Sequence, residues 1–268
     1  MDTRKPVTVP ALRRMKAERR PIVAVTAYDY ASAVAVDQAG VDLILVGDSL
    51  GTVILGHRDT LAVTLDEMLH HTRAVTRGAR HALVVGDMPF MSYPDPAEAV
   101  RSGGRFFKET GVAAVKLEGG GPVQVACVKA LVEQGMPVVA HLGFTPQRIH
   151  EFGGYRVQGR TDEAADRMVH EAGLLEEAGA AALVLELVPP ALAQRITADL
   201  GIPTIGIGAG PHCDGQIQVF HDLVGLFTDH VPKHAARYAS LHAEIKLAVE
   251  RYGADVRAGT FDTASSPA

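Results

Sequence analysis

The chain has 268 residues, with 26 Lys and Arg against 31 Asp and Glu, and a formal net charge of −5 at pH 7. Hydrophobic residues make up 47% of the chain and charged residues 21%, which excludes a globally disordered protein and provides the apolar side chains of a large core. The acidic balance argues against sequence-independent nucleic-acid binding, which needs a basic face, and no apolar run reaches the roughly 20 residues of a membrane span. Cys127 and Cys213 are too few for a disulfide framework, so we expect a reducing, cytoplasmic environment.

The first predicted element is a short helix within residues 9–20, with Leu12 and Met15 on one face. Short apolar runs follow, and their near-continuous hydrophobicity is typical of strands buried on both faces of a parallel sheet. The eight runs are 22–26, 43–46, 83–86, 113–117, 137–140, 182–185, 204–207 and 223–227. Between and after them, apolar stripes with helical spacing lie within residues 65–72, 123–130, 168–178 and 238–249.

Eight β/α units within about 250 residues favour a single (β/α)8 barrel, also called a TIM barrel. A doubly wound open sheet uses the same local units and remains the alternative. We find no linker and no interior low-complexity segment, so we expect one catalytic domain over residues 1–257. Residues 258–268 are rich in Ala, Ser and Thr without periodicity, and we expect them to form a disordered tail.

Ionisable side chains stand at the C-terminal ends of five consecutive runs. In a parallel barrel these ends meet at one rim, where barrel enzymes carry their active sites. The side chains at these ends, with one neighbouring serine, are Asp48, Ser49, Asp87, Lys116, Glu118, His141 and Glu186. Their convergence predicts a functional site.

Each of these residues also has a purely structural explanation. Asp48, Ser49 or Asp87 could cap a following helix. Lys116 and Glu118 lie on one side of a strand and could simply pair, and His141 could be a satisfied core histidine. A buried carboxylate without a partner is costly, however, and five such roles would have to converge on one concave face.

Three carboxylates within reach of one another repel unless a cation lies among them. Asp48, Asp87 and Glu118 are the plausible oxygen ligands, directly or through water. Oxygen ligands select a hard divalent ion, Mg²⁺ before Zn²⁺. Glu186 then remains as a possible base on the far side of the site.

Two other patterns carry weaker signals. The segment 206–210, Gly-Ile-Gly-Ala-Gly, follows the seventh run and could bind a phosphate, but its spacing is not that of a dinucleotide loop and tight turns explain its glycines equally well. The chain has no G-x-S-x-G motif, and neither cysteine has a histidine partner in a motif, so covalent acyl chemistry has no support.

Ten short stretches, spread over roughly residues 9–250, match one known family in order along the chain. They are TAYDY (26–30), AGVDLILVGDSLG (39–51), TLDEMLHHTRAV (64–75), DMPFMSY (87–93), AVKLEGG (114–120), HLGFTPQ (141–147), GGYRVQGR (153–160), ALVLE (182–186), IPTIGIGAG (202–210) and DGQ (214–216). On these stretches the chain resembles the ketopantoate hydroxymethyltransferase family. It departs from the family pattern at His57, where Tyr is expected, and at Leu187, where Cys is common.

The resemblance implies a barrel of the phosphoenolpyruvate/pyruvate type. It implies transfer of a hydroxymethyl group from 5,10-methylenetetrahydrofolate to 3-methyl-2-oxobutanoate, giving 2-dehydropantoate on the route to pantothenate. It also implies Mg²⁺ held by Asp48, Asp87 and Glu118, with Asp48, Ser49, Asp87, Lys116 and His141 contacting the substrate and Glu186 accepting the proton. The family pattern further implies a homo-oligomer, a decamer, with no nucleic-acid or membrane partner.

Two alternatives remain open. Related barrels cleave or rearrange oxo acids, although the lyases among them commonly carry a catalytic cysteine in a loop that is absent from this sequence. A catalytically inactive barrel that serves in assembly or binding is the other, and the carboxylates retained at four strand ends argue against it.

Overall fold

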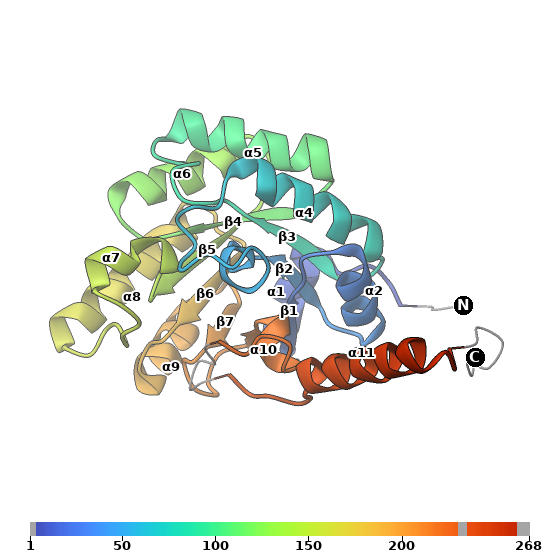
Figure 1. The fold of residues 1–268 in the computed structure, drawn as a ribbon. Coiled ribbons are helices and arrows are strands. Elements are labelled where there is room, and N and C mark those ends of the chain that lie inside the picture. The colour runs from blue at the N-terminus through green and yellow to red at the C-terminus, as the bar shows by residue number, and fades with distance from the viewer. Residues whose placement is uncertain (1–3, 230–234, 262–268) are drawn as a thin grey trace. The chain divides into compact units, whose positions relative to one another are not determined.

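The computed structural model describes residues 4–229 and 235–261, and its chain divides into two compact units after Val219. The first unit contains eight parallel strands that close into a barrel in sequence order, so the predicted (β/α)8 barrel is confirmed and the open sheet is excluded (Figure 1). The strands are β1 (Ile22–Thr26), β2 (Leu43–Val46), β3 (Leu83–Asp87), β4 (Ala114–Glu118), β5 (Val138–Gly143), β6 (Ala182–Glu186), β7 (Thr204–Ile207) and β8 (Gly215–Gln218).

The first seven strands lie where the apolar runs predict them, but the eighth prediction is wrong. The run 223–227 is not a strand, because Leu223 ends helix α10 (Phe220–Leu223). Strand β8 instead has the sequence Gly-Gln-Ile-Gln, in which only Ile217 is apolar and buried. At Gly215 a Cβ would lie 2.5 Å from the carbonyl oxygen of Ile22, so the close approach of β8 to β1 requires glycine.

Helices connect the strands and surround the barrel in Figure 1. In the first unit they are α1 (Val9–Ala17), α2 (Tyr30–Gln38), α3 (Leu50–Val53), α4 (Leu65–Gly78), α5 (Pro96–Thr110), α6 (Pro122–Glu133), η1 (Pro146–Arg148), α7 (Ile149–Phe152), α8 (Asp162–Glu177) and α9 (Pro190–Asp199). Several begin at side-chain caps. Thr64 and Glu67 form a reciprocal capping box at α4, and Asp29 with Ser32 forms another at α2.

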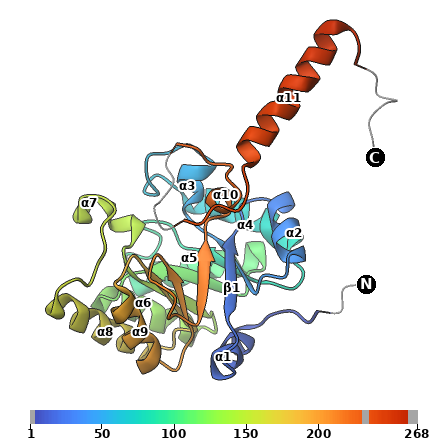
Figure 2. The same ribbon diagram turned by 90° about the horizontal axis from the view of Figure 1, so that it is seen from below.

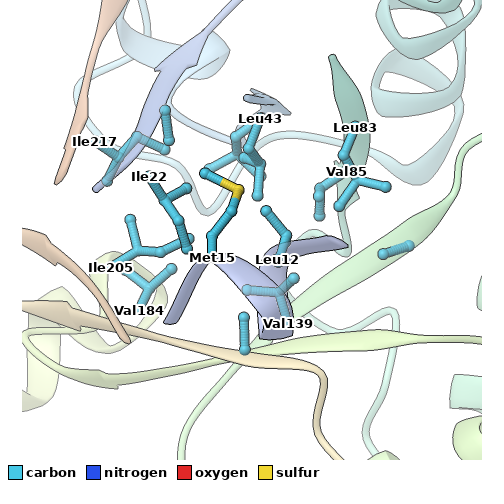
Figure 3. Packing of buried hydrophobic residues seen from close by; sticks show 14 residues of the cluster. Leu12, Met15, Ile22, Leu43, Leu83, Val85, Val139, Val184, Ile205 and Ile217 are labelled. Carbon is cyan, nitrogen blue, oxygen red and sulfur yellow. The ribbon is translucent and has the colours of Figure 1, made fainter. Parts of the chain in front are cut away.

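The predicted N-terminal helix closes one end of the barrel core. Leu12 and Met15 of α1 are buried, and in Figure 3 they lie among side chains from the strands, such as Ile22, Leu43 and Val139. Figure 2 places α1 beside the N-terminal end of β1. This end of the barrel is therefore filled by apolar side chains, and the opposite end, where the strands finish, is left for polar groups.

The helical stripes have mixed outcomes. In α4, Met68, Leu69 and Thr72 are buried as predicted. In α8, the buried residues are Met168, Ala172 and Leu175, also as predicted. In α6 the buried face is Cys127, Val128 and Leu131, and Val123 is exposed, so the predicted stripe is displaced.

The second unit contains α10 and α11 (Leu241–Ala258), and none of the residues of α11 is buried. Within the described residues of this unit, its predicted apolar stripe is therefore not buried. Helix α11 extends to the start of the predicted tail; residues 262–268 of that tail lie outside the described residues, and one domain over 1–257 stays a prediction. No helix in the described ranges is both long and apolar enough to cross a membrane.

Candidate active site

The alternation of side chains along each strand brings the predicted residues into the barrel. The core cluster contains Val85 of β3, Ala114 of β4, Val139 of β5 and Val184 of β6. Residues two positions further along a strand lie on the same face. Continuing along each strand, the next residues on this inner face are Asp87 in β3, Lys116 and then Glu118 in β4, His141 in β5 and Glu186 in β6. The same face that buries the apolar core thus ends in charged side chains.

Asp48, Asp87 and Lys116 form the first half of the site. The Lys116 ammonium donates to both carboxylate oxygens of Asp87, at 2.8 Å to Oδ1 and 2.9 Å to Oδ2. The backbone N–H of Asp48 donates to Oδ2 of Asp87 at 3.1 Å, which joins the ends of β2 and β3. All three residues are buried. Neither aspartate caps a helix with its side chain, so the capping explanation does not hold for them.

Glu118, His141 and Glu186 form the second half. Glu118 Oε1 lies 3.4 Å from Lys116 Nζ and 3.4 Å from His141 Nδ1. The other ring nitrogen of His141, Nε2, lies 3.4 Å from Oε2 of Glu186. His141 therefore stands between two carboxylates and connects β4 with β6. It is not a core histidine satisfied by the backbone.

Ser49 lies beside the first half of the site. A Cβ built on Gly47 would be 2.9 Å from the Ser49 hydroxyl and 3.8 Å from Oδ2 of Asp87, so both groups flank this glycine. The Ser49 hydroxyl lies 2.8 Å from the hydroxyl of Tyr28, and it does not cap α3. All seven predicted residues are thus brought together at the C-terminal ends of β2 to β6.

The site carries more negative than positive charge. Burial, reinforced by Asp87 and Glu118, raises the pKa of Asp48 well above its usual value. Burial also raises the pKa of Asp87, although Lys116 opposes the shift. Burial works against the charge of Glu118, yet Lys116 and His141 lower the pKa of this carboxyl.

The two basic groups respond to the same charges. Burial opposes a charged lysine, but Asp87 and Glu118 outweigh it and raise the pKa of Lys116. Burial likewise opposes a charged ring at His141, and Glu118 with Glu186 raises the pKa of this histidine to about 9. The site thus brings four carboxyl groups beside two basic groups, and a further cation would stabilise the ionised carboxylates.

This arrangement fits a hard divalent cation. Oδ1 of Asp48 has no hydrogen-bond partner within residues 4–229 and 235–261, whereas Oδ2 accepts from Gln147. Among the same residues, no three His, Cys, Asp or Glu side chains form a set that could hold a metal by themselves. Mg²⁺ is commonly held by one or two carboxylates, with waters and substrate oxygens as the other ligands. Asp48 and Asp87 match that donor set.

Two buried residues of the site were not predicted. Gln147 of η1 donates from its side chain to Asp48 Oδ2 and from its backbone to Glu118 Oε2. The hydroxyl of Tyr93 donates to the Gln147 side chain. Both residues lie within stretches that carry the family resemblance, and this resemblance is the feature of the sequence that could have pointed to them. Neither side chain is charged, so nothing else distinguishes them.

The glycine-rich segment after β7 is accounted for by packing. A Cβ at Gly210 would lie 2.7 Å from Pro190, and this glycine has a φ of +78°. Gly208 also has a positive φ, of +61°. The backbone therefore requires glycine here whether or not a phosphate binds.

Comparison with known proteins identifies the family. The family model described as ketopantoate hydroxymethyltransferase matches residues 6–264. A protein of Nitratidesulfovibrio vulgaris (strain DP4), named 3-methyl-2-oxobutanoate hydroxymethyltransferase, is 56% identical over 261 residues, which cover 97% of this chain and 84% of the relative. A protein with the same name from Gloeobacter violaceus is 56% identical over 253 residues and covers 94% of this chain and 97% of the relative.

Solved structures with lower identity share the fold. Phosphonopyruvate hydrolase in complex with oxalate and Mg²⁺ has a TM-score of 0.65 at 14% identity, covering 98% of this chain and 92% of that one. A 2,3-dimethylmalate lyase, a member of the PEP mutase/isocitrate lyase superfamily, has a TM-score of 0.61 at 19% identity, covering 97% and 92%. These likenesses concern the barrel alone. From the match over nearly its whole length and the relatives that are more than half identical, the chain belongs to the ketopantoate hydroxymethyltransferase family.

Proposed function

We propose that this chain transfers a hydroxymethyl group from 5,10-methylenetetrahydrofolate to 3-methyl-2-oxobutanoate and yields 2-dehydropantoate for pantothenate biosynthesis. Family membership and the names of the relatives support the transferase activity. The observation that carries the proposal is the buried cluster at the ends of β2 to β6, in which carboxylates, a lysine and a histidine line one end of the barrel.

We propose Mg²⁺ as the metal, held by Asp48 and Asp87, with Glu118 completing the site through water. The family and its structural neighbours are consistent with a divalent metal. When bound, the ion would act as a Lewis acid that stabilises the negative charge developing on the 2-oxo oxygen of the substrate. The unpartnered Oδ1 of Asp48 and the excess of carboxylates support this assignment.

Removal of the C3 proton is the difficult step. The α-carbon of a ketone is a far weaker acid than a carboxylic acid, and each pKa unit of difference costs about 1.4 kcal/mol, so an unassisted transfer to a carboxylate lies steeply uphill. We assign Glu186 as the proton acceptor. Its side chain is less buried than the other carboxylates of the site, and its Oε2 lies 3.4 Å from Nε2 of His141, which can hold its orientation. Lys116 is buried beside Asp87, and its positive charge can stabilise the negative charge that develops on the 2-oxo oxygen of the substrate.

The remaining atoms balance without an oxidant or reductant. The C3–H bond of the oxo acid breaks and its proton passes to Glu186, and C3 then bonds to the methylene carbon of the folate. The methylene carbon gives up both of its bonds to folate nitrogens, one as C3 bonds to it and the other as water supplies the hydroxyl group. The proton taken by Glu186 and the remaining proton of the water go to these two nitrogens, and tetrahydrofolate leaves. Ser49 is placed beside Asp87, where its hydroxyl can donate to the substrate carboxylate. Holding the two substrates face to face contributes through proximity.

An oxo-acid lyase or mutase on the same barrel is the second candidate, because the structural neighbours include such enzymes. Neither cysteine supports it. Cys127 is buried in α6, and burial raises the pKa of its thiol to about 11. Cys213 precedes β8, and burial raises the pKa of its thiol as well.

An assay with and without the folate separates the two. The purified chain is incubated with Mg²⁺ and 3-methyl-2-oxobutanoate, and products are followed by NMR. Formation of 2-dehydropantoate only when 5,10-methylenetetrahydrofolate is present supports the proposal. Cleavage or rearrangement of the oxo acid without folate would replace it with the second candidate.

We further propose that the chain works as a homo-oligomer, a decamer by family resemblance. The exposed apolar side chains of α11 support this proposal.

A further inference from the structure

A buried amide lies between two carboxylates of the site. Nε2 of Gln147 lies 2.9 Å from Asp48 Oδ2 and 3.0 Å from the carbonyl oxygen of Met88. The backbone N–H of Gln147 donates to Oε2 of Glu118 at 3.1 Å. One residue of η1 therefore binds Asp48, at the end of β2, and Glu118, at the end of β4.

Tyr93 determines which way this amide faces. The Tyr93 hydroxyl accepts from the backbone N–H of Glu118 at 3.3 Å and donates its own proton to Oε1 of Gln147. Since Oε1 accepts this proton, the NH₂ group has to face Asp48 and the Met88 carbonyl, and both of its hydrogens are used there. A flipped amide would set two acceptor oxygens against each other at Asp48 and two donors at Tyr93.

We propose that Gln147 is a positioning residue for Asp48 through its side-chain amide, and that Tyr93 locks this amide in the productive orientation. The amide occupies Oδ2 of Asp48 and leaves Oδ1 available. The inference rests on the proposed Mg²⁺ site, since Asp48 is one of its two carboxylates. Partners that orient metal ligands commonly change metal affinity by roughly 10–100-fold when they are removed.

A purely structural role makes a different prediction. If Gln147 only fills space, then Met, which has a similar volume and no amide, preserves metal binding. If Tyr93 only packs, then Phe preserves it too. A positioning role requires both variants to weaken the metal site while the fold persists, and it requires their effects to overlap because Tyr93 acts through Gln147.

The test titrates MgCl₂ alone into the full chain by calorimetry, for the parent, Gln147→Met, Tyr93→Phe and the double variant. Gln134→Met and Tyr30→Phe are matched controls, because the side chains of Gln134 and Tyr30 are exposed and are not among the residues of the site. We expect Gln147→Met to raise the Kd for Mg²⁺ roughly 10–100-fold and Tyr93→Phe to raise it by a smaller factor. The double variant should bind no more weakly than Gln147→Met, and the controls should match the parent.

Turnover gives a second readout. Saturating Mg²⁺ should restore most of kcat in Tyr93→Phe. The substitution should instead raise the Mg²⁺ concentration that is needed for half-maximal activity. A parental Kd in a folded Gln147→Met, or multiplicative effects in the double variant, would overturn the inference and leave the metal site intact. If Gln147→Met does not fold by circular dichroism, Tyr93→Phe decides, and an unchanged Kd overturns the inference. A parent that binds no Mg²⁺ would overturn the metal site itself, and this inference with it.

Discussion

At the scale of single residues, the site depends on charges that are buried but compensated. Lys116 and Asp87 are only 4% and 1% exposed, and they form a direct ion pair. Removing one partner of a buried pair leaves the other charge without compensation, which costs about 3–5 kcal/mol. Variants of this pair should therefore keep the shape of the side chain and, as far as possible, its hydrogen bonds.

The substitution Asp87→Asn tests the metal site in that way. It removes one negative charge. An amide oxygen at the position of Oδ2 can still accept from Lys116 and from the Asp48 backbone, while the NH₂ group replaces Oδ1 and its hydrogen bond from Lys116 is lost. We expect the Kd for Mg²⁺ to rise at least about 10-fold, because Mg²⁺ depends on few, charged oxygen ligands. Calorimetric titration measures this change, with exposed Asp255→Asn as the control. An unchanged Kd would move the metal away from Asp87.

The charged residues of the site are predictable from the sequence, whereas the neutral Gln147 and Tyr93 are not. Asp48, Asp87 and Glu186 stand out because a carboxylate directly after a buried strand needs a reason to be there. Tyr93 lies in a loop and Gln147 in the three-residue helix η1, and a polar residue is ordinary in either place. Their importance arises from distances between elements far apart in the sequence, such as the 2.9 Å from Gln147 to Asp48.

At the scale of elements, the end of β5 sets the position of Glu186. Gly143 pairs with Glu186 across β5 and β6 and has a φ of +96°. The next residue, Phe144, donates its N–H to the Glu186 carbonyl at 2.8 Å. Leu187 directly follows Glu186 with a φ of +48°, which is uncommon for a residue other than glycine. The proposed base thus sits on a tightly constrained stretch of backbone.

The substitution Gly143→Ala should disturb that stretch. A Cβ there would overlap the Glu186 carbonyl oxygen and lie 2.7 Å from Val188. Gly135→Ala is the matched control, since Gly135 also has a positive φ, +77°, but no atom lies within 4 Å of its added Cβ. Both variants should lose about 1–2 kcal/mol through the left-handed backbone. Only Gly143→Ala should lose about 1–3 kcal/mol more through overpacking, together with most of its activity.

Urea unfolding and turnover measure the two effects. Equal free energies of unfolding and equal activities for the two variants would contradict the proposed close contact between β5 and the Glu186 backbone.

The elements themselves were predictable to different degrees. Strands β2 and β6 are continuous apolar runs because helices cover their outer faces and the barrel core covers their inner faces, so their sequences identify them. Strand β8 has alternating glutamines, with Gln216 exposed, and resembles a loop when taken alone. Only the closure of the barrel, through its pairing with β1 and β7, makes it a strand.

At the scale of the whole molecule, the last helix of the second unit carries exposed apolar side chains. Helix α11 exposes five large apolar side chains, namely Ile245, Leu247, Val249, Tyr252 and Val256. Contiguous exposed apolar surface commonly marks an interface. An 18-residue helix with no buried residue also has little to stabilise it in isolation.

We therefore expect the chain to assemble in solution. Sedimentation equilibrium should give a mass far above the 28.4 kDa of one chain, and about ten times that value for the decamer that the family resemblance implies. Val249→Asp should lower the mass if α11 lies in an interface. A parent that sediments as a monomer at all concentrations would contradict the prediction of an oligomer.

We propose that Glu186 removes the C3 proton of the oxo acid at a site built around Asp48 and Asp87. The most direct test is exchange of that proton with deuterated water, followed by NMR on 3-methyl-2-oxobutanoate with Mg²⁺ and without folate. Glu186→Gln should abolish the exchange while keeping the parental Kd for Mg²⁺, and the exposed control Glu177→Gln should exchange at the parental rate. Exchange that persists in Glu186→Gln would contradict the account, because another group would then take the proton.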